Sequence, residues 1–246
     1  MTTESLSPAE AQRQLLEKRA TLNQGSTPTL APLSTLMPII PWPTPKPEPG
    51  DDDAREKEAA AAEQRRWTAR ILGVLLGAGV PTRYLDASLS QVSPAVRNQF
   101  SPSESVFITG TAGTGKTFLA AAILRAGLDV PTRRTVRMVG VPELLLKIQA
   151  SFGERATKTS DEILDAYSDA STLVLDDLGA ERTTEWALQT LYVLINRRWE
   201  SEKQTIITSN LSLDELTSRL SDRIASRIAG MCRVIALSGR DRRIQG

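Results

Sequence analysis

Residues 106–124 read VFITGTAGTGKTFLAAAIL, in which two apolar runs enclose a glycine-rich loop. The first run, residues 106–109, is short and rich in β-branched and aromatic side chains, so it predicts a buried strand. The second run predicts a helix over residues 116–126. The loop matches the complete pattern G-x-x-x-x-G-K-[ST], which requires this order of strand, loop and helix. The stretch therefore predicts a phosphate-binding loop in an α/β fold.

Each residue type in this loop has a chemical reason. Glycines let the backbone wrap closely, so that successive N–H groups point at phosphate oxygens, and the helix N-terminus adds partial positive charge. Lys116 should reach the β- and γ-phosphates of ATP, and the Thr117 hydroxyl should bind Mg²⁺. A glycine-rich turn without a ligand is the less favoured alternative. The expected nucleotide-binding residues are Gly110, Thr111, Ala112, Gly113, Thr114, Gly115, Lys116 and Thr117.

A second motif, LVLDD at residues 173–177, is an apolar run that ends in two carboxylates. This is the pattern of a Walker B motif, in which Asp176 would hold Mg²⁺ through water. Asp177 occupies the position where many ATPases carry glutamate and would polarise the attacking water. Because its side chain is one methylene shorter, we expect slow ATP hydrolysis, which suits a timer better than a motor. The alternative is that both carboxylates only cap the turn into Leu178.

Short β-rich segments alternate with helical segments along the rest of the chain. Strands are predicted at residues 106–109, 135–139, 173–175, 205–208 and 234–237. Helices are predicted at residues 116–126, 141–151, 160–169, 184–200 and 212–229. This alternation is typical of a mainly parallel sheet with helices on both faces. We therefore expect a five-stranded α/β P-loop fold.

The N-terminal part of the chain has a different composition. Eight of the 14 prolines fall between Pro28 and Pro49, so residues 1–50 are expected to form a short helix and a proline-rich linker that binds a partner. Trp42 in this linker either packs loosely on a surface or belongs to a partner-binding motif. Residues 51–100 are expected to be a helical lead-in, and residues 101–246 the ATPase core.

Composition excludes several classes of site. The 246 residues contain no histidine and one cysteine, Cys232, which excludes a Ser–His–Asp triad, histidine-ligated metals, an intrachain disulfide and a cysteine-rich zinc site. The net charge of +1 gives no case for bulk attraction to nucleic acid or membrane. The longest apolar stretch, residues 71–80, is too short to span a bilayer, and the N-terminus does not read as a signal peptide. We expect a cytoplasmic protein without membrane contact.

Four segments taken in order resemble one family. They are residues 110–117, 173–179, 208–211 and 222–227, and together they resemble the AAA+ ATPases of the DnaC/DnaI helicase-loader and IstB transposition-helper group. Residues 78–84 and 237–243 are similar to further segments of that group, so the resemblance covers about residues 65–246. The resemblance implies an AAA+ core without a helical lid, in agreement with the nine residues that follow Leu237.

The resemblance also implies roles for four polar residues. Asn210 matches sensor 1, which positions the attacking water, and Arg227 matches the arginine finger that completes a neighbouring subunit's ATP site. Arg223, one helical turn away, could assist or substitute. Arg243 matches sensor 2, which contacts nucleotide within its own subunit. Guanidinium groups suit phosphate contacts because they stay charged and make forked hydrogen bonds. The alternative is that these arginines only keep the surface soluble.

The favoured function implied by the resemblance is a loader that delivers a hexameric replicative DNA helicase to single-stranded DNA. Binding and hydrolysis of ATP would act as the switch, with self-association through the arginine finger. One rival is an IstB-like transposition helper that forms filaments on duplex DNA. A rival of another class is a nucleotide-gated adaptor with little turnover. Candidate DNA contacts are Lys147, Phe152, Arg155 and Lys158, although Phe152 could instead belong to the core.

Overall fold

The computed structural model describes residues 51–128, 135–153 and 156–239. The predicted helix and linker within residues 1–50 lie outside the described residues, as do Arg155 and Arg243. Among the described residues, no helix combines the length and the apolar character needed to cross a membrane.

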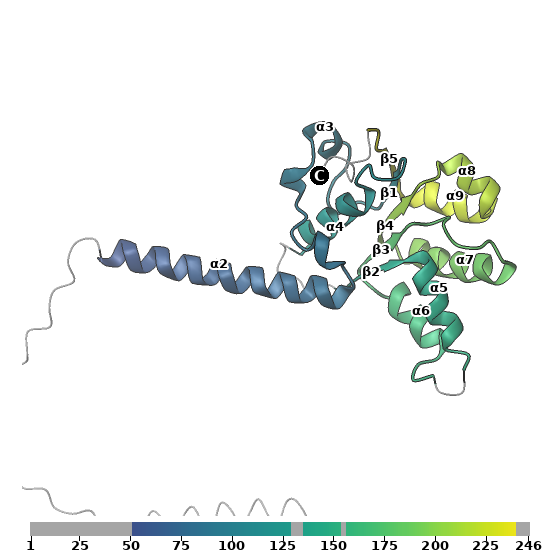
Figure 1. Ribbon diagram of the computed structural model, residues 1–246, viewed down its shortest axis with the longest axis horizontal. Coiled ribbons are helices and arrows are strands. Elements are labelled where there is room, and N and C mark those ends of the chain that lie inside the picture. Colours follow the sequence, from purple (N-terminus) through teal and green to yellow (C-terminus); the bar gives the residue numbers. More distant parts are fainter. Residues whose placement is uncertain (1–50, 129–134, 154–155, 240–246) are drawn as a thin grey trace, which may run out of the picture. The chain divides into compact units, whose positions relative to one another are not determined.

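Five parallel strands form one sheet in the order β2-β3-β4-β1-β5 (Figure 1). The strands are β1 (Val106–Thr109), β2 (Val136–Gly140), β3 (Thr172–Asp176), β4 (Gln204–Ser209) and β5 (Arg233–Ala236). In register, Ile108 of β1 lies opposite Thr208 of β4 and Ile235 of β5. The expectation of a five-stranded parallel sheet is confirmed, with strand bounds within two residues of those predicted.

The two faces of the sheet carry two hydrophobic clusters. Phe107, Leu175 and Ile207 belong to one cluster, whereas their chain neighbours Ile108, Val174 and Ile206 belong to the other. This division follows from the alternation of side chains along a strand. Fully buried parallel strands are apolar on both faces, which explains why these runs show little polar alternation.

Helices cover both faces (Figure 1). The helix α4 (Lys116–Ala126) packs into the cluster that contains Ile108, together with the end of α2 (Asp51–Ala78). The helices that pack into the other cluster are α5 (Val141–Ala150), α6 (Ser160–Ser168), α7 (Glu185–Glu200), α8 (Leu213–Arg219) and α9 (Asp222–Met231).

The single helix predicted over residues 212–229 is wrong, because the structure has two helices there. The chain leaves helical geometry at Ser221, whose φ and ψ are 177° and 156°. The Ser221 hydroxyl then accepts a hydrogen bond from the Ile224 N–H and begins α9. A serine followed by an aspartate is an N-cap signal, and here it restarts the helix within an otherwise continuous helical pattern.

The lead-in segment joins the core through its last turns. Ile71, Leu75 and Ala78 of α2 are buried against the sheet. Gly79 ends the helix with a φ of +92°, and a Cβ there would lie 2.6 Å from the Met138 carbonyl oxygen. Three short helices then lead to β1: η2 (Thr82–Tyr84), η3 (Leu89–Gln91) and α3 (Pro94–Arg97).

Candidate nucleotide-binding site

The glycine-rich loop runs from the end of β1 to the start of α4. Gly110 and Gly115 adopt φ values of +149° and +96°, which side chains with a Cβ rarely accept. A Cβ at Gly110 would also collide with the Leu237 carbonyl oxygen. Gly115 is the N-cap of α4. The Thr114 hydroxyl donates a hydrogen bond to the Thr111 carbonyl oxygen at 2.9 Å and so stabilises the turn. The loop therefore presents backbone N–H groups at a helix N-terminus, where an anion is favoured.

Lys116 lies inside this loop. Its side chain is buried, and its Nζ donates to the carbonyl oxygens of Gly110 at 2.8 Å and Thr111 at 2.9 Å. The same ammonium donates to the Asn210 Oδ1 at 2.6 Å, although the two residues are 94 positions apart in sequence. The parallel pairing of β1 with β4 brings the phosphate loop and Asn210 to the same edge of the sheet.

The carboxylate of Asp176 accepts hydrogen bonds from two hydroxyl groups. The Thr117 hydroxyl lies 3.0 Å from Oδ1 and 3.2 Å from Oδ2, and the Thr208 hydroxyl donates to Oδ1 at 2.7 Å. Burial raises the pKa of the Asp176 carboxyl, while the hydrogen bonds from Thr208 and Thr117 and the charge of Lys116 oppose that rise.

A carboxylate and a hydroxyl on adjacent elements are ligands that Mg²⁺ accepts. The described residues contain no group of three or more acidic, cysteine or histidine side chains that could hold a metal by itself. The donor set of Thr117 and Asp176 thus fits Mg²⁺ bound with water and phosphate oxygens, which is the arrangement this ion prefers.

Asp177 follows directly but faces a different environment. Its side chain is exposed, and its backbone has a φ of +58°, an uncommon value for a residue other than glycine. The Asp177 N–H donates to the Thr208 hydroxyl at 2.9 Å, so Thr208 contacts both aspartates. This turn directs the two carboxylates differently: Asp176 toward the phosphate loop, and Asp177 toward solvent.

A pocket of about 350 Å³ adjoins the loop. It is lined by Tyr84, Gln91, Gly113, Gly115, Lys116, Thr117 and Phe118. Tyr84 and Gln91 come from η2 and η3, and sequence reasoning did not identify them as pocket residues. The only available signal was the family-like segment 78–84. Arg83 stacks over Tyr84 at 4.7 Å, and Arg125 of α4 donates to the Leu85 carbonyl oxygen, so this side of the pocket is attached to α4.

Comparison with known proteins identifies the family. The profile of the IstB-like ATP binding proteins matches residues 89–245, more than half of the chain. The chain belongs to this family. It is 26% identical to the replicative helicase loader DnaC of Escherichia coli K12 over an alignment of 124 residues. This alignment covers 50% of this chain and 49% of DnaC. It is 28% identical over 159 residues to the replicative helicase loader DnaI of Bacillus subtilis, which covers 59% of this chain and 50% of DnaI.

A solved structure supports the same assignment. The crystal structure of the DnaC helicase loader superposes with a TM-score of 0.55 at 27% identity and covers 64% of this chain and all of that one. The chain spans about half the length of the two curated loaders. The AAA+ fold and the membership of the DnaC-like and IstB-like group, expected from the ordered motifs, are confirmed.

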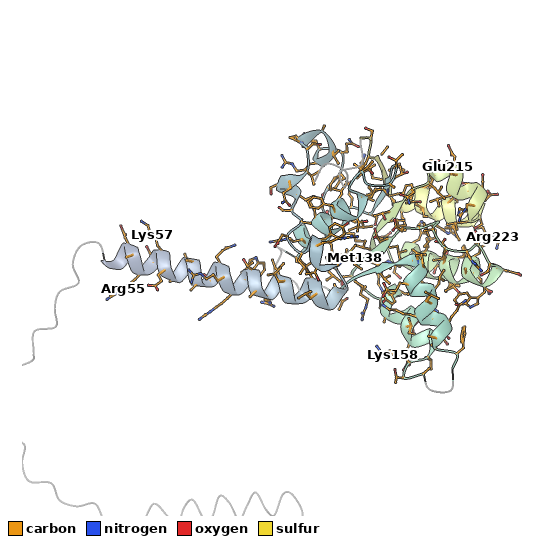
Figure 2. The ribbon with its side chains drawn as sticks, viewed as in Figure 1. Arg55, Lys57, Met138, Lys158, Glu215 and Arg223 are labelled. Atoms are coloured by element: carbon orange, nitrogen blue, oxygen red, sulfur yellow. The ribbon has the colours of Figure 1, made fainter. Side chains whose placement is uncertain are left out.

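Two of the predicted arginines, Arg223 and Arg227, lie on α9. Arg227 is half-buried between α9 and α7, and its Nε donates to the Asn196 Oδ1 at 3.0 Å. Within the described residues, none of its contacts is with the phosphate loop, Asp176 or Asn210. Arg223 is exposed near the start of α9 (Figure 2). Arg227 therefore does not complete the nucleotide site of its own subunit.

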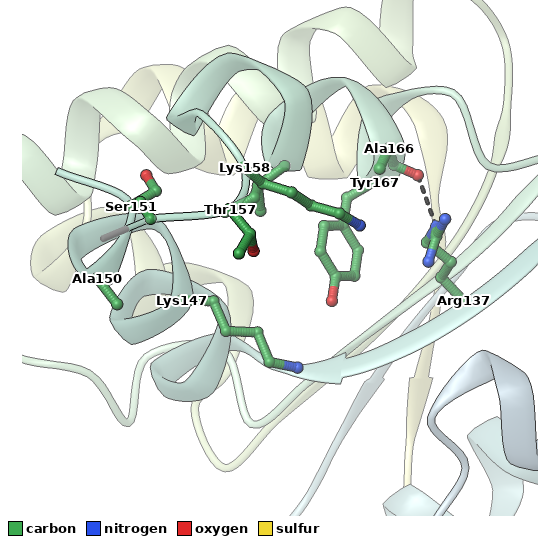
Figure 3. Close-up of a pocket in the computed structure, with 10 residues that line it drawn as sticks. Arg137, Lys147, Ala150, Ser151, Thr157, Lys158, Ala166 and Tyr167 are labelled. Carbon is green, nitrogen blue, oxygen red and sulfur yellow. Dashed lines mark hydrogen bonds between the residues drawn. The ribbon is translucent and has the colours of Figure 1, made fainter. Parts of the chain in front are cut away.

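Two of the predicted DNA contacts line a pocket of about 480 Å³ between α5 and α6 (Figure 3). Lys147 and Lys158 line this pocket together with Arg137 and Tyr167. The Arg137 Nε donates to the Ala166 carbonyl oxygen at 2.7 Å, and its guanidinium lies 5.5 Å from the centre of the Tyr167 ring. The pocket of this IstB-like chain thus combines three cationic side chains with one aromatic ring.

Phe152 does not line that pocket. Its ring is 63% exposed and meets Trp186 edge-on, with centroids 6.2 Å apart. The alternative that Phe152 belongs to the core is therefore wrong.

Proposed function

We propose that this chain is an ATP-switched loader of a replicative DNA helicase. The observation that carries the proposal is the hydrogen bond between Lys116 and Asn210, because it joins the phosphate loop to the segment that leads into α8 and α9. Membership of the ATP-binding family and similarity to two helicase loaders support it.

The residues suggest how the switch works. Lys116 exchanges the Asn210 oxygen for oxygens of the β- and γ-phosphates, while Thr117 and Asp176 hold Mg²⁺. Asn210 then becomes available to orient the attacking water. Its neighbour Ser209 donates to the Leu178 carbonyl oxygen at 2.6 Å, so a shift at Asn210 is transmitted to the turn after Asp176.

Hydrolysis in this scheme is slow and needs a second subunit. Asp177 polarises water with a short and exposed side chain, and Arg227 of one copy completes the ATP site of the next. Single-stranded DNA binds along the α5–α6 pocket, where Lys147 and Lys158 neutralise phosphates and Tyr167 stacks on a base. Residues 1–50 bind the helicase, and the conformation of the core depends on which nucleotide is bound.

Affinity capture tests this proposal. The tagged chain is incubated in extract of its own host with Mg²⁺ and ATP, and Lys116→Ala and a deletion of residues 1–50 serve as matched controls. We expect a hexameric helicase that is recovered with the full chain and lost with the deletion. Recovery of a transposase without helicase would contradict the loader and favour the transposition helper, which shares the family profile.

A rate measurement separates the switch from a passive adaptor. Phosphate release is compared for the wild-type chain and Lys116→Ala, each with and without single-stranded DNA. We expect a slow wild-type rate that rises with DNA and falls to background in the variant. Equal rates under all conditions would contradict an ATPase.

A further inference from the structure

Two residues of α7 hold the side chain of Arg227. The Arg227 Nε donates to the Asn196 Oδ1 at 3.0 Å, and the guanidinium carbon lies 3.9 Å from the centre of the Trp199 ring. Asn196 in turn donates its Nδ2 to the Glu200 Oε1 at 2.9 Å, which fixes the direction of the amide. The hydrogen bond restrains the guanidinium within its plane, and the indole restrains it across that plane.

Arg227 differs from Arg197 and Arg233, whose guanidinium groups pair with carboxylates. Arg197 pairs with Asp165 at 2.6 Å, and Arg233 pairs with Glu104 at 3.1 Å. Across the described ranges, Arg227 makes no ion pair, and its two terminal nitrogens have no hydrogen-bond partner. Its orientation is thus fixed while its charge and its forked pair of donors stay available.

The indole that supports Arg227 is not part of the core. Trp199 is 38% exposed. It lies across one face of α9, since a Cβ added at Gly230 would be 3.6 Å from the Trp199 Nε1, and Gly230 is three residues after Arg227. The ring thus stacks on the cation at the surface of the domain, where it restrains the guanidinium.

We infer that Trp199 and Asn196 are positioning residues, which hold Arg227 ready to contact a phosphate group in the nucleotide site of a second copy of the chain. This inference rests on the proposed role of Arg227 in trans. A free arginine side chain loses much rotational freedom when it binds, and a side chain that is already ordered loses less. The stacking and the bond to Nε thus lower the entropy cost of phosphate contact between subunits.

Subunit complementation tests the inference. The Arg227→Ala variant keeps its own ATP site but supplies no arginine to the site of a neighbouring subunit. The Lys116→Ala variant supplies that arginine but has a defective ATP site of its own. We expect ATP hydrolysis by their mixture, with Mg²⁺ and single-stranded DNA, to exceed the sum of the separate rates. We call Lys116→Ala the arginine donor, and we call the rate of the mixture above the sum of the separate rates the gain. When the donor also carries Trp199→Leu, the gain should fall roughly five- to tenfold, the scale of one cation–π contact. Trp199→Phe keeps a ring and should retain most of the gain.

Asn196→Asp in the Lys116→Ala donor provides a second test that does not depend on removing a ring. The new carboxylate would pair with Arg227 and neutralise it, so the gain should fall. The melting temperature of the variant shows whether the loss of the amide bond to Glu200 unfolds the protein. A merely structural role predicts no loss of complementation.

The outcomes separate the two proposals. If Arg227→Ala and Lys116→Ala fail to complement each other, the role of Arg227 in trans is wrong. If they complement but the Trp199→Leu and Asn196→Asp donors complement equally well, the positioning inference is wrong. Light scattering of each mixture shows whether the donors assemble. If the Trp199→Leu donor fails to assemble, complementation by the Asn196→Asp donor alone tests the positioning inference.

Discussion

The Lys116 ammonium lies 2.6 Å from the Asn210 side-chain oxygen, so the phosphate loop and the end of β4 are joined directly. The connection continues through Ser209 to Leu178, and through the Leu211 carbonyl oxygen, which accepts the Thr109 hydroxyl at 2.8 Å. The ends of β1, β3 and β4 are thus coupled at one edge of the sheet. We therefore expect a change in the partner of Lys116 to act on all three strand ends.

Asn210→Ala should uncouple binding from hydrolysis. ATP affinity should stay equal or rise, because the variant removes an acceptor that competes with the phosphates for Lys116. The turnover rate should fall roughly 10–100-fold, since the attacking water loses a group that orients it. Nucleotide titration and phosphate release measure the two effects, and Asn98→Ala, an exposed asparagine after α3, is the control. A variant that hydrolyses at the wild-type rate would contradict the role of Asn210.

Asp176→Asn should stabilise the fold while it removes the response to Mg²⁺. Burial raises the pKa of the Asp176 carboxyl, so at neutral pH the folded state holds a carboxylate that the unfolded chain solvates better. Removing that charge should increase the free energy of unfolding by about 1 kcal/mol, or raise the melting temperature by about 2–4 °C. Melting curves without nucleotide measure the gain, and the addition of Mg²⁺ to ATP should raise the melting temperature further only in the wild-type chain.

The stability difference between Asp176→Asn and the wild-type chain should depend on pH. A carboxyl whose pKa is higher in the folded than in the unfolded chain costs stability above its folded pKa. That cost disappears as the pH falls through the raised pKa toward the unfolded value of 3.8. The stability difference between Asp176→Asn and wild type should therefore shrink on acidification. A difference that grows at low pH would show that the carboxylate is stabilising.

Lys147→Ala combined with Lys158→Ala should weaken binding of single-stranded DNA. Each phosphate contact contributes about 0.7 to the slope of log K against log salt, so the double variant should lower the slope by about 1.4. Tyr167→Ala should lower the affinity without changing the slope, because stacking of a base releases no counterion. Fluorescence anisotropy with a labelled oligothymidine at several salt concentrations measures both quantities.

Lys57→Ala is the control for that measurement. Lys57 is an exposed lysine of α2, and it does not line the pocket (Figure 2). Unchanged affinity and slope in the double lysine variant would contradict DNA binding at this pocket.

The sequence predicted the parts of the site that local pattern determines. The loop of residues 110–117 and the acidic end of β3 are continuous motifs, and parallel topology forces the ends of their strands to one edge. Asn210 required the family resemblance, because an asparagine after a strand has no signature of its own. Its contact with Lys116 depends on which strands are neighbours, and single-sequence patterns do not encode strand order.

Other features depended on contacts between distant elements. Tyr84 and Gln91 lie in short helices without periodicity, and only their packing on α4 brings them to the pocket. The break at Ser221 was missed because the helical pattern of apolar residues continues across it. The stacking of Arg227 on Trp199 joins α9 to α7, and nothing in either segment alone predicts it.

The structure buries the side chain of Arg198 completely. Its Nε donates to the Thr205 hydroxyl at 2.8 Å. Its terminal nitrogens donate to backbone carbonyl oxygens of Tyr167, Ser168, Ala170 and Gln204. Burial lowers the pKa of Arg198 to about 10, so the group stays charged at neutral pH. One side chain thus joins the end of α6 and the turn before β3 to the start of β4.

Arg198→Met should destabilise the protein by about 3–5 kcal/mol, because it leaves several buried carbonyl oxygens without a donor. Arg198→Lys should recover only part of this loss, since three donors cannot replace five in a planar fork. The neighbouring Arg197→Met is the matched control, because its ion pair with Asp165 is exposed and should contribute less than about 1 kcal/mol. Urea unfolding followed by circular dichroism measures all three variants. Equal stability of the Arg198→Met and Arg197→Met proteins would show that the buried contacts of Arg198 do not hold these elements together.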